Sequence, residues 1–185
     1  MDITFVTGNQ SKVDYLAKKL GRPVKHYRLD LVEIQSLDLH EVAEHKARQA
    51  YDKLRCPVLV EDVSLVVDAW GDLPGPLIKW FVEANSVSDY GLLSRLADAF
   101  SDRSATARLV YALYGGDEIH FFEGEMRGTI AKDPAGKRGW GWDHVFINDG
   151  QSQTRGELDE QTYDETSYRL KAINKLKLYL ENETS

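Results

Sequence analysis

The chain has 185 residues, of which 42% are hydrophobic and 29% charged, as is typical of an ordinary globular domain. The net charge of -7 argues against nonspecific DNA or RNA binding, although a local positive pocket or a metal still allows an anionic small molecule. No apolar run is long enough to span a bilayer and the N-terminus lacks a signal-peptide pattern, so we expect a cytoplasmic protein with no membrane or nucleic-acid partner.

The first segment predicts a strand, a turn and a helix. Asp2 to Val6 is rich in β-branched and aromatic residues, and Ser11 to Leu20 carries apolar residues at helical spacing. Thr7-Gly8-Asn9 is then a strand-to-helix turn, where free N–H groups favour phosphate. The helix dipole disfavours a cation such as Lys12 in a first helical turn, and a phosphate bound there would explain it. The alternative is an ordinary solvated lysine after a capping Asn9.

The next segment predicts a short strand, a loop and a longer helix. Val24 to Leu29 forms the strand, and the loop after it carries Glu33. Asp38 to Glu41 has the spacing of a capping box, with Asp38 as the cap and Glu41 as its partner. The helix that follows extends to about Leu54. On this evidence alone, Lys46 is a solvated helical lysine.

The central stretch combines a strand with two adjacent carboxylates. Val58 to Val60 is an apolar run typical of a buried strand, and Glu61 and Asp62 follow at its predicted carboxyl end. Ligands of open α/β sheets bind at such strand ends, and carboxylate oxygens suit Mg²⁺. The alternative is a strand end that is simply acidic and solvated. A turn rich in glycine and proline then leads to Lys79-Trp80-Phe81.

The second half predicts a helix, an antiparallel ribbon and a final helix. The helix covers Tyr90 to Phe100, and the ribbon pairs Ala105–Tyr114 with Glu118–Ile130 through a glycine-rich turn. A short strand follows at Val145–Ile147, and the last helix covers Tyr168–Leu180.

Two features of this half are chemically informative. Trp140-Gly141-Trp142-Asp143 precedes the short strand, and its tryptophans either belong to the core, which we favour, or stack on a flat ligand. Arg169 lies at the start of the last helix, where a cation again indicates a nearby anion. Residues 148 to 159 between these features are predicted to form a polar loop.

These motifs together resemble the inosine triphosphate pyrophosphatases, also called Ham1-like proteins. The resemblance covers nearly the whole chain, with the family's order and spacing. The segment from Gly71 to Phe81 is its most specific part. The other matching segments are Thr7-Gly8-Asn9 with Lys12 (family TGNxxK), Val60-Glu61-Asp62 (VEDT), Trp140-Gly141-Trp142-Asp143 (FGWDP) and Ser167-Tyr168-Arg169 (SHR).

The resemblance implies an α/β fold with a mixed, twisted central sheet and flanking helices. It also implies one domain over residues 1–185, with two lobes and a nucleotide-binding cleft between them. The implied reaction converts the deaminated purine nucleoside triphosphates ITP, dITP and XTP to the monophosphate and pyrophosphate, removing them from the nucleotide pool. Mg²⁺, with Mn²⁺ as an alternative, is the implied cofactor, and a homodimer is the implied assembly.

The same resemblance assigns roles at the phosphate end of the site. Asp62 is the implied general base, and Glu33 and Asp62 are the implied metal ligands, with Glu61 in support. The implied phosphate-binding and substrate-binding residues at this end are Thr7, Gly8, Asn9, Lys12 and Lys46. Lys12 and Glu61 are also counted among the catalytic residues.

At the base end, Trp140 is implied to stack on the base, with Gly141 and Trp142 beside it. Asp143 is implied to read the edge of the base and Arg169 to face its 6-oxo group. The remaining residues implied to border the sugar or base are Lys79, Phe81 and Tyr168.

Several residues depart from the family pattern. Tyr168 replaces a histidine, Val63 a threonine and His144 a proline, and a family lysine before Ser-His-Arg has no obvious counterpart in a loop that looks shortened. We therefore expect hydrolysis to be retained, whereas these departures leave the base selectivity open. The alternatives are a nucleotide-binding protein with reduced or lost catalysis, and the same hydrolysis of a pyrimidine or modified nucleotide.

Overall fold

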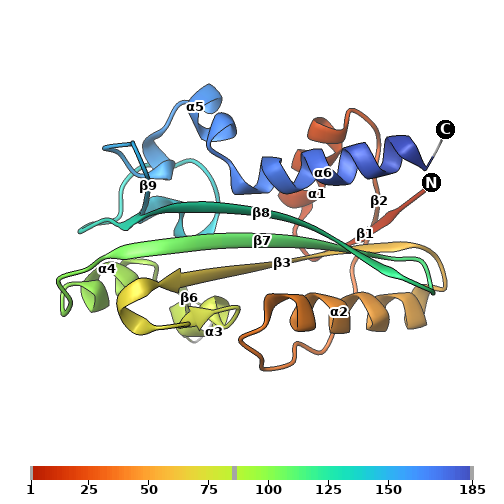
Figure 1. Ribbon diagram of the computed structural model, residues 1–185, viewed down its shortest axis with the longest axis horizontal. Helices are drawn as coiled ribbons and strands as arrows, with labels where there is room; N and C mark the ends of the chain where they lie inside the picture. The colour runs from red at the N-terminus through yellow and green to blue at the C-terminus, as the bar shows by residue number, and fades with distance from the viewer. Residues whose placement is uncertain (1, 85–86, 184–185) are drawn as a thin grey trace. The chain divides into compact units, whose positions relative to one another are not determined.

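The computed structural model describes residues 2–84 and 87–183 and shows a mixed α/β fold (Figure 1). Its main sheet has seven strands in the order β2-β1-β3-β7-β8-β9, with β4 also paired to β3, and β5 and β6 form a separate two-stranded sheet. Strand β1 is parallel to β2 and β3, whereas β4 and β9 pair antiparallel with β3 and β8. The predicted fold class, a mixed sheet with helices, is confirmed.

The strands are β1 Thr4–Val6, β2 Lys25–Tyr27, β3 Val58–Val67, β4 Pro74–Gly75, β5 Glu83–Ala84, β6 Val87–Ser88, β7 Ser104–Tyr114, β8 Ile119–Ile130 and β9 Phe146–Asn148. The α-helices of the described ranges are α1 Gln10–Leu20, α2 Leu39–Leu54, α3 Ile78–Val82, α4 Gly91–Ala97, α5 Glu160–Glu165 and α6 Tyr168–Asn182. Short 3-10 turns cover Asp68–Trp70, Gly141–His144 and Arg155–Glu157. Within the part of the chain that the structure describes, no helix has the length and apolar character needed to cross a membrane.

The prediction that Glu61 and Asp62 end a strand is wrong. Strand β3 continues from Val58 to Val67, so both carboxylates lie in its middle. A pair of charges normally terminates a buried strand because an unpaired buried charge is costly. Here each carboxylate has a cationic partner from another part of the chain, so the strand continues through them.

Most of the other predicted elements are present. The two N-terminal helices, the last helix and the β7–β8 hairpin are confirmed, whereas the helix expected over Tyr90–Phe100 is shorter. Helix α3, helix α5 and the β5–β6 pair were not predicted, because each has at most six residues and shows little periodicity. Asp38 caps α2 as expected, but Glu41 does not complete the box directly: Ser36 Oγ accepts from the Asp38 N–H and donates to Glu41.

The described chain divides into two compact units. Unit 1 comprises residues up to 63, 109–124 and those from 169 onward, and unit 2 comprises 64–108 and 125–168. Strands β3, β7 and β8 each contribute residues to both units. The prediction that residues 1–185 act as a single domain stays a prediction.

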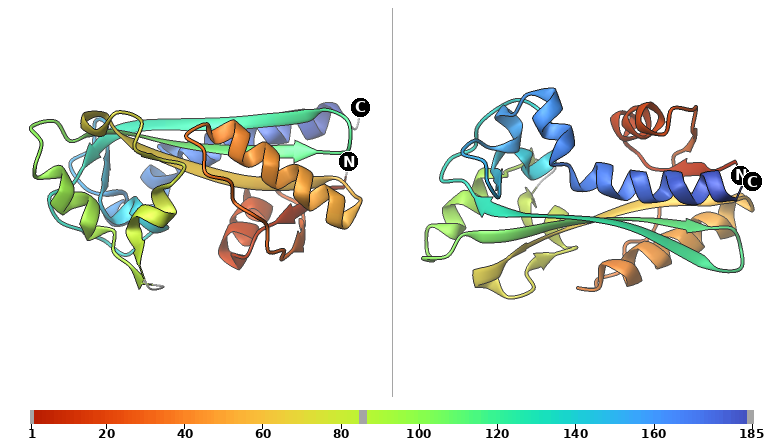
Figure 2. Two further views of the ribbon diagram at one scale, coloured as in Figure 1. Left: turned by 90° about the horizontal axis from the view of Figure 1, so that it is seen from below. Right: turned by 45° about the horizontal axis from the view of Figure 1, so that its top comes forward.

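In unit 1, helices cover the two faces of the strands, and side-chain alternation decides which residues meet which helix (Figures 1 and 2). Val58 and Val60 belong to the core cluster that includes the small residues of α2, Ala43 and Ala47. On the other face, Tyr179 of α6 packs its ring 5.4 Å from Phe122. Residues next to each other in β3 therefore have different surroundings.

Unit 2 has its own core and its own polar ties. Trp142, Val145 and Phe146 are buried around β9, which pairs with the end of β8. Arg103 donates to the carbonyl oxygens of Ile130 and Ala131 at 2.7 and 2.6 Å, which ties the start of β7 to the end of β8.

Candidate functional site

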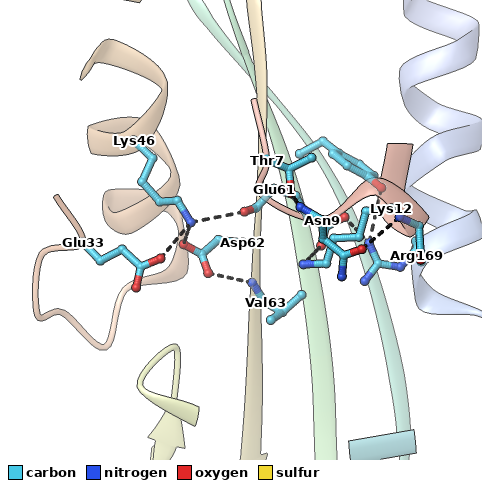
Figure 3. A network of polar contacts seen from close by, with 11 residues as sticks. Thr7, Asn9, Lys12, Glu33, Lys46, Glu61, Asp62, Val63 and Arg169 are labelled. Atoms are coloured by element: carbon cyan, nitrogen blue, oxygen red, sulfur yellow. Dashed lines mark hydrogen bonds and ion pairs between the residues drawn. The ribbon is translucent and has the colours of Figure 1, made fainter. Parts of the chain in front are cut away.

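Glu61 and Asp62 are adjacent in β3 and lie in two different polar clusters (Figure 3). Successive side chains of a strand point to opposite faces of the sheet. Glu61 therefore points toward Lys12 of α1 and Arg169 of α6, and Asp62 points toward Lys46 of α2. The two carboxylates consequently meet different partners.

The Glu61 cluster is a buried carboxylate held by two cations. Arg169 Nη1 donates to Glu61 Oε2, and Lys12 Nζ lies 2.9 Å from Oε1. The Tyr111 hydroxyl lies 3.5 Å from Arg169 Nη1. Burial opposes ionisation of Glu61, but Arg169 and Lys12 outweigh it and lower the pKa of Glu61 to about 2. Glu61 is therefore ionised at neutral pH.

The Thr7-Gly8-Asn9 turn positions Lys12 as predicted for a strand-to-helix connection. Asn9 caps α1 by accepting from the Ser11 N–H at 2.9 Å, and Thr7 Oγ1 accepts from the Asn9 N–H at 3.2 Å. Gly8 in this turn is exposed. An anion was expected near Arg169, and Glu61 is that anion. Glu61 also pairs with Lys12, for which a phosphate was expected. Binding of a phosphate by this turn stays a prediction.

The Asp62 cluster gathers two carboxylates around one ammonium group. Lys46 Nζ lies 3.2 Å from Asp62 Oδ2, 3.5 Å from Glu33 Oε1 and 3.4 Å from the Glu61 carbonyl oxygen. Asp62 Oδ1 accepts from the Val63 N–H at 2.9 Å. The side chain of Lys46 is only 15% exposed, so its interpretation as a solvated helical lysine is wrong.

The electrostatics of Asp62 are opposite to those of Glu61. Burial raises the pKa of Asp62, and the charge of Glu33 adds to this effect, whereas Lys46 and the Val63 N–H oppose it. Burial also opposes the charge on Lys46, but Asp62 and Glu33 raise its pKa and keep it protonated. The pKa of Asp62 is therefore raised, whereas that of its neighbour Glu61 is lowered.

The donor set around Lys46 fits a divalent cation. Two carboxylates share one ammonium, which leaves negative charge and oxygen ligands of the kind that Mg²⁺ prefers. Among the residues that the structure describes, no group of three or more histidine, cysteine, aspartate or glutamate side chains is arranged to hold a metal. Glu33 and Asp62 could thus supply two ligands. Water and substrate phosphates would supply the rest, as is usual for Mg²⁺.

In unit 2, Asp143 organises the segment Trp140-Gly141-Trp142. Its Oδ2 accepts from the Trp140 N–H and from the Tyr163 hydroxyl, each at 2.8 Å, and its Oδ1 accepts from Arg155 Nε at 2.8 Å. Asp143 is 3% exposed, so these internal donors surround its carboxylate. The role assigned to Asp143 at the base edge stays a prediction, and the contacts in this structure give it a structural task.

Sequence reasoning missed Arg155, which lay in a predicted polar loop. Its side chain is completely buried, with Nη1 3.3 Å from Asn148 Oδ1 and 3.2 Å from Thr166 Oγ1. Its guanidinium also lies over the Tyr163 ring, 4.2 Å from the centroid. No periodic or motif signal marks a single arginine in such a segment, because its partner Asp143 is selected by tertiary contact.

The remaining predicted residues of unit 2 are spread over several elements. Trp142 is buried, which confirms its interpretation as a core residue, whereas Trp140 is only partly buried. Lys79 Nζ lies 5.0 Å from the Trp80 ring centroid, and Phe81 packs against Trp70 with 5.8 Å between centroids. Tyr168 is buried at the start of α6 and belongs to unit 2, whereas the next residue, Arg169, belongs to unit 1.

Unit 1 thus brings together the predicted phosphate and metal residues, and unit 2 holds most of the predicted base residues. A mixed α/β fold that holds lysines and carboxylates beside the N-terminal turn of a helix has groups of the kind that bind phosphate and a divalent cation. The Ham1 family model matches residues 3–179, so the chain belongs to the Ham1 family.

Relatives and solved structures agree with this assignment. The chain is 39% identical to inosine triphosphate pyrophosphatase 2 of Trypanosoma cruzi, an alignment that covers 96% of this chain and 91% of the relative. It is 39% identical to inosine triphosphate pyrophosphatase of Yarrowia lipolytica, covering 97% and 96%. A HAM1 protein from Coxiella burnetii has a similar structure, with a TM-score of 0.88, 26% identity, and coverage of 98% of this chain and 99% of that one.

Proposed function

We propose that this protein is a nucleoside triphosphate pyrophosphatase that hydrolyses ITP, dITP and XTP to the nucleoside monophosphate and pyrophosphate. The observation that carries the proposal is the Asp62 cluster, a buried carboxylate of raised pKa beside Lys46 and Glu33. Family membership and two relatives named inosine triphosphate pyrophosphatase support the choice of substrate.

The geometry gives Asp62 the properties of a general base. A base works best when its pKa approaches the working pH, and burial moves the pKa of Asp62 in that direction. Its Oδ1 accepts from the Val63 N–H, and its Oδ2 faces Lys46, so the carboxylate is held in a fixed orientation. A water molecule that donates a proton to Asp62 would become the nucleophile at the α-phosphorus.

Other residues of unit 1 would bind and orient the triphosphate. Glu33 and Asp62 would hold Mg²⁺, or Mn²⁺ in its place, which when bound supplies charge neutralisation on the phosphate oxygens. Lys12 and the turn amides would bind the distal phosphates. Glu61 would act through Lys12 and Arg169, because it fixes both cations by ion pairs.

Residues of unit 2 would contact the base. Trp140, which is only partly buried, would stack on it, with Lys79, Phe81 and Tyr168 nearby. A base with a 6-oxo group accepts hydrogen bonds where adenine donates them. Selectivity would therefore depend on how the donors of the site are arranged.

The test measures pyrophosphate release with Mg²⁺ from ITP, XTP, dITP, ATP, GTP, CTP and UTP at matched concentrations. We expect turnover on ITP and XTP, and a loss on the order of 10²–10⁴-fold in Asp62→Asn, the range for removal of a general base. Asp14→Asn, which removes an exposed carboxylate of α1 that accepts from Gln10, is the matched control and should leave the rate unchanged. Full activity of a folded Asp62→Asn variant would refute the assignment of the base.

The same panel separates the alternatives. Pyrimidine-biased turnover would keep the chemistry and change the substrate, whereas thermal stabilisation by nucleotide without turnover would indicate a binding protein. We further propose that residues 1–185 act as one domain, and that the protein works as a homodimer in the cytoplasm. Light scattering after size-exclusion chromatography tests the dimer, and a mass near 21.0 kDa, that of one chain, would refute it.

A further inference from the structure

Arg155 is a buried cation for which the proposed chemistry has no role. Its side chain is 0% exposed, and burying a guanidinium is costly unless its charge is paired. Asp143 supplies that pair with Oδ1 2.8 Å from Arg155 Nε. Charge-assisted bonds of this kind are stronger than neutral ones, so Arg155 strongly restrains the Asp143 carboxylate.

The other oxygen of Asp143 transmits this restraint to the aromatic segment. Oδ2 accepts from the Trp140 N–H at 2.8 Å and from the Tyr163 hydroxyl at 2.8 Å. Arg155 is itself oriented by Asn148 and by the ring of Tyr163. The chain of contacts therefore leads from Arg155 through Asp143 to the main chain at Trp140.

A second set of contacts joins the same two segments independently of these side chains. The Gly156 carbonyl oxygen accepts from the Lys137 and Arg138 N–H groups at 2.8 and 3.0 Å. Gly139 has φ +85°, and a Cβ there would lie 2.1 Å from Asp143 Oδ2, so only glycine fits. The loop that leads into Trp140 is thus packed against the segment that carries Arg155.

We propose that Arg155 is a positioning residue for base recognition, which acts through Asp143 to hold Trp140-Gly141-Trp142 in its binding conformation. This proposal rests on the proposed function, which places the base against that segment. Removal of the guanidinium leaves a buried carboxylate without its cation, while two neutral donors remain. The aromatic segment then loses its fixed conformation, and the affinity for the base falls.

The test compares a ligand that has a base with one that has none. Calorimetry in EDTA measures the dissociation constants of ITP, ATP and inorganic tripolyphosphate for the wild type, Arg155→Met and Arg155→Lys. We expect Arg155→Met to weaken ITP binding at least tenfold and to leave tripolyphosphate binding within twofold. Arg155→Lys keeps the charge and loses the planar guanidinium, so its dissociation constant for ITP should lie between those of the wild type and Arg155→Met.

Arg108→Met is the matched control, since Arg108 is a half-exposed arginine of unit 2 paired with Glu125 at 2.7 Å. It should change none of the three constants. Equal weakening of ITP and tripolyphosphate by Arg155→Met, or no weakening of either, would overturn the proposal and leave Arg155 a purely structural residue. If Arg155→Met does not fold, Tyr163→Phe and Arg155→Lys are measured in its place. Weaker binding of ITP with unchanged binding of tripolyphosphate then supports the proposal, and equal weakening of both, or of neither, overturns it.

The binding experiment tests the positioning role of Arg155, and the turnover panel tests the proposed function, so each proposal can be refuted without the other. Absence of turnover in a wild type that binds ITP would refute the proposed function and leave the positioning role open to the comparison of dissociation constants. A wild type that binds ITP no more tightly than tripolyphosphate would overturn the positioning role even if pyrophosphate is released.

Discussion

Among the described residues, two buried arginine–carboxylate clusters differ in how their charge is balanced. In unit 1, Lys12 and Arg169 share the single carboxylate of Glu61. In unit 2, Asp143 has one cation, Arg155, and two neutral donors. Two cations on one carboxylate favour the approach of a further anion, whereas a balanced pair holds the main chain. The same pair of residue types therefore leaves an excess of positive charge in one unit and a balanced ion pair in the other.

The largest expected effect comes from removal of the Glu61 charge. Glu61→Gln leaves the buried Arg169 and the partly exposed Lys12 close together without their carboxylate, and loss of one partner of a buried ion pair typically costs about 3–5 kcal/mol of unfolding free energy. Urea denaturation measures this loss. Glu183→Gln, at an exposed glutamate beyond the end of α6, is the control and should stay within about 0.5 kcal/mol. An equally small effect of Glu61→Gln would show that the cluster does not stabilise unit 1.

Acid should weaken the Glu61 cluster in a defined pH range. The pKa of Glu61 in the folded protein, about 2, is lower than its ordinary value of 4.5. The stabilisation by ionised Glu61 is thus complete when the pH is above the ordinary pKa of 4.5, and it is lost as the pH falls through the pKa of the folded protein. For a shift of this size the loss is on the order of 3 kcal/mol. Denaturation of the metal-free protein between pH 6 and 2, with Glu61→Gln as reference, measures it.

Asp62 should change the unfolding free energy with pH in the opposite direction to Glu61. Its pKa is raised in the folded protein, so its neutral form is favoured and its contribution is lost as the pH rises. If the unfolding free energy of the wild type changes between pH 6 and 2 in the same way as that of Glu61→Gln, the ion pairs of Glu61 do not stabilise the fold.

The smallest effect is expected in unit 2. Tyr163→Phe removes one neutral donor to Asp143 and keeps the ring under Arg155, so a loss of about 2 kcal/mol is expected for a hydrogen bond to a charged group. The double mutant with Arg155→Met should lose less than the sum of the two single changes, because both act on one carboxylate. Strict additivity in urea denaturation would mean that the three residues do not form a unit.

Much of unit 1 could be predicted from the sequence, and less of unit 2. Helical periodicity identified α1, α2 and α6, and the dipole argument correctly required an anion near Arg169. The identity of that anion was not predictable, because Glu61 and Arg169 are 108 residues apart in the chain. Arg155 gave no signal at all, since only the packing of the folded chain shows that Asp143 needs a cation.

The continuity of β3 has a consequence for insertions and deletions. Glu61 and Asp62 are joined by one peptide bond, and the pleat of the strand sends them into separate surroundings. A shift of pairing by one residue would turn Asp62 toward the face of α1 and α6 and Glu61 toward the face of α2, so both carboxylates would leave their present cations. The surroundings of each carboxylate thus depend on which face of the sheet its position in β3 occupies. One residue added or lost between Pro57 and Glu61 would therefore separate both carboxylates from their cations, although the carboxylates and cations themselves are unchanged.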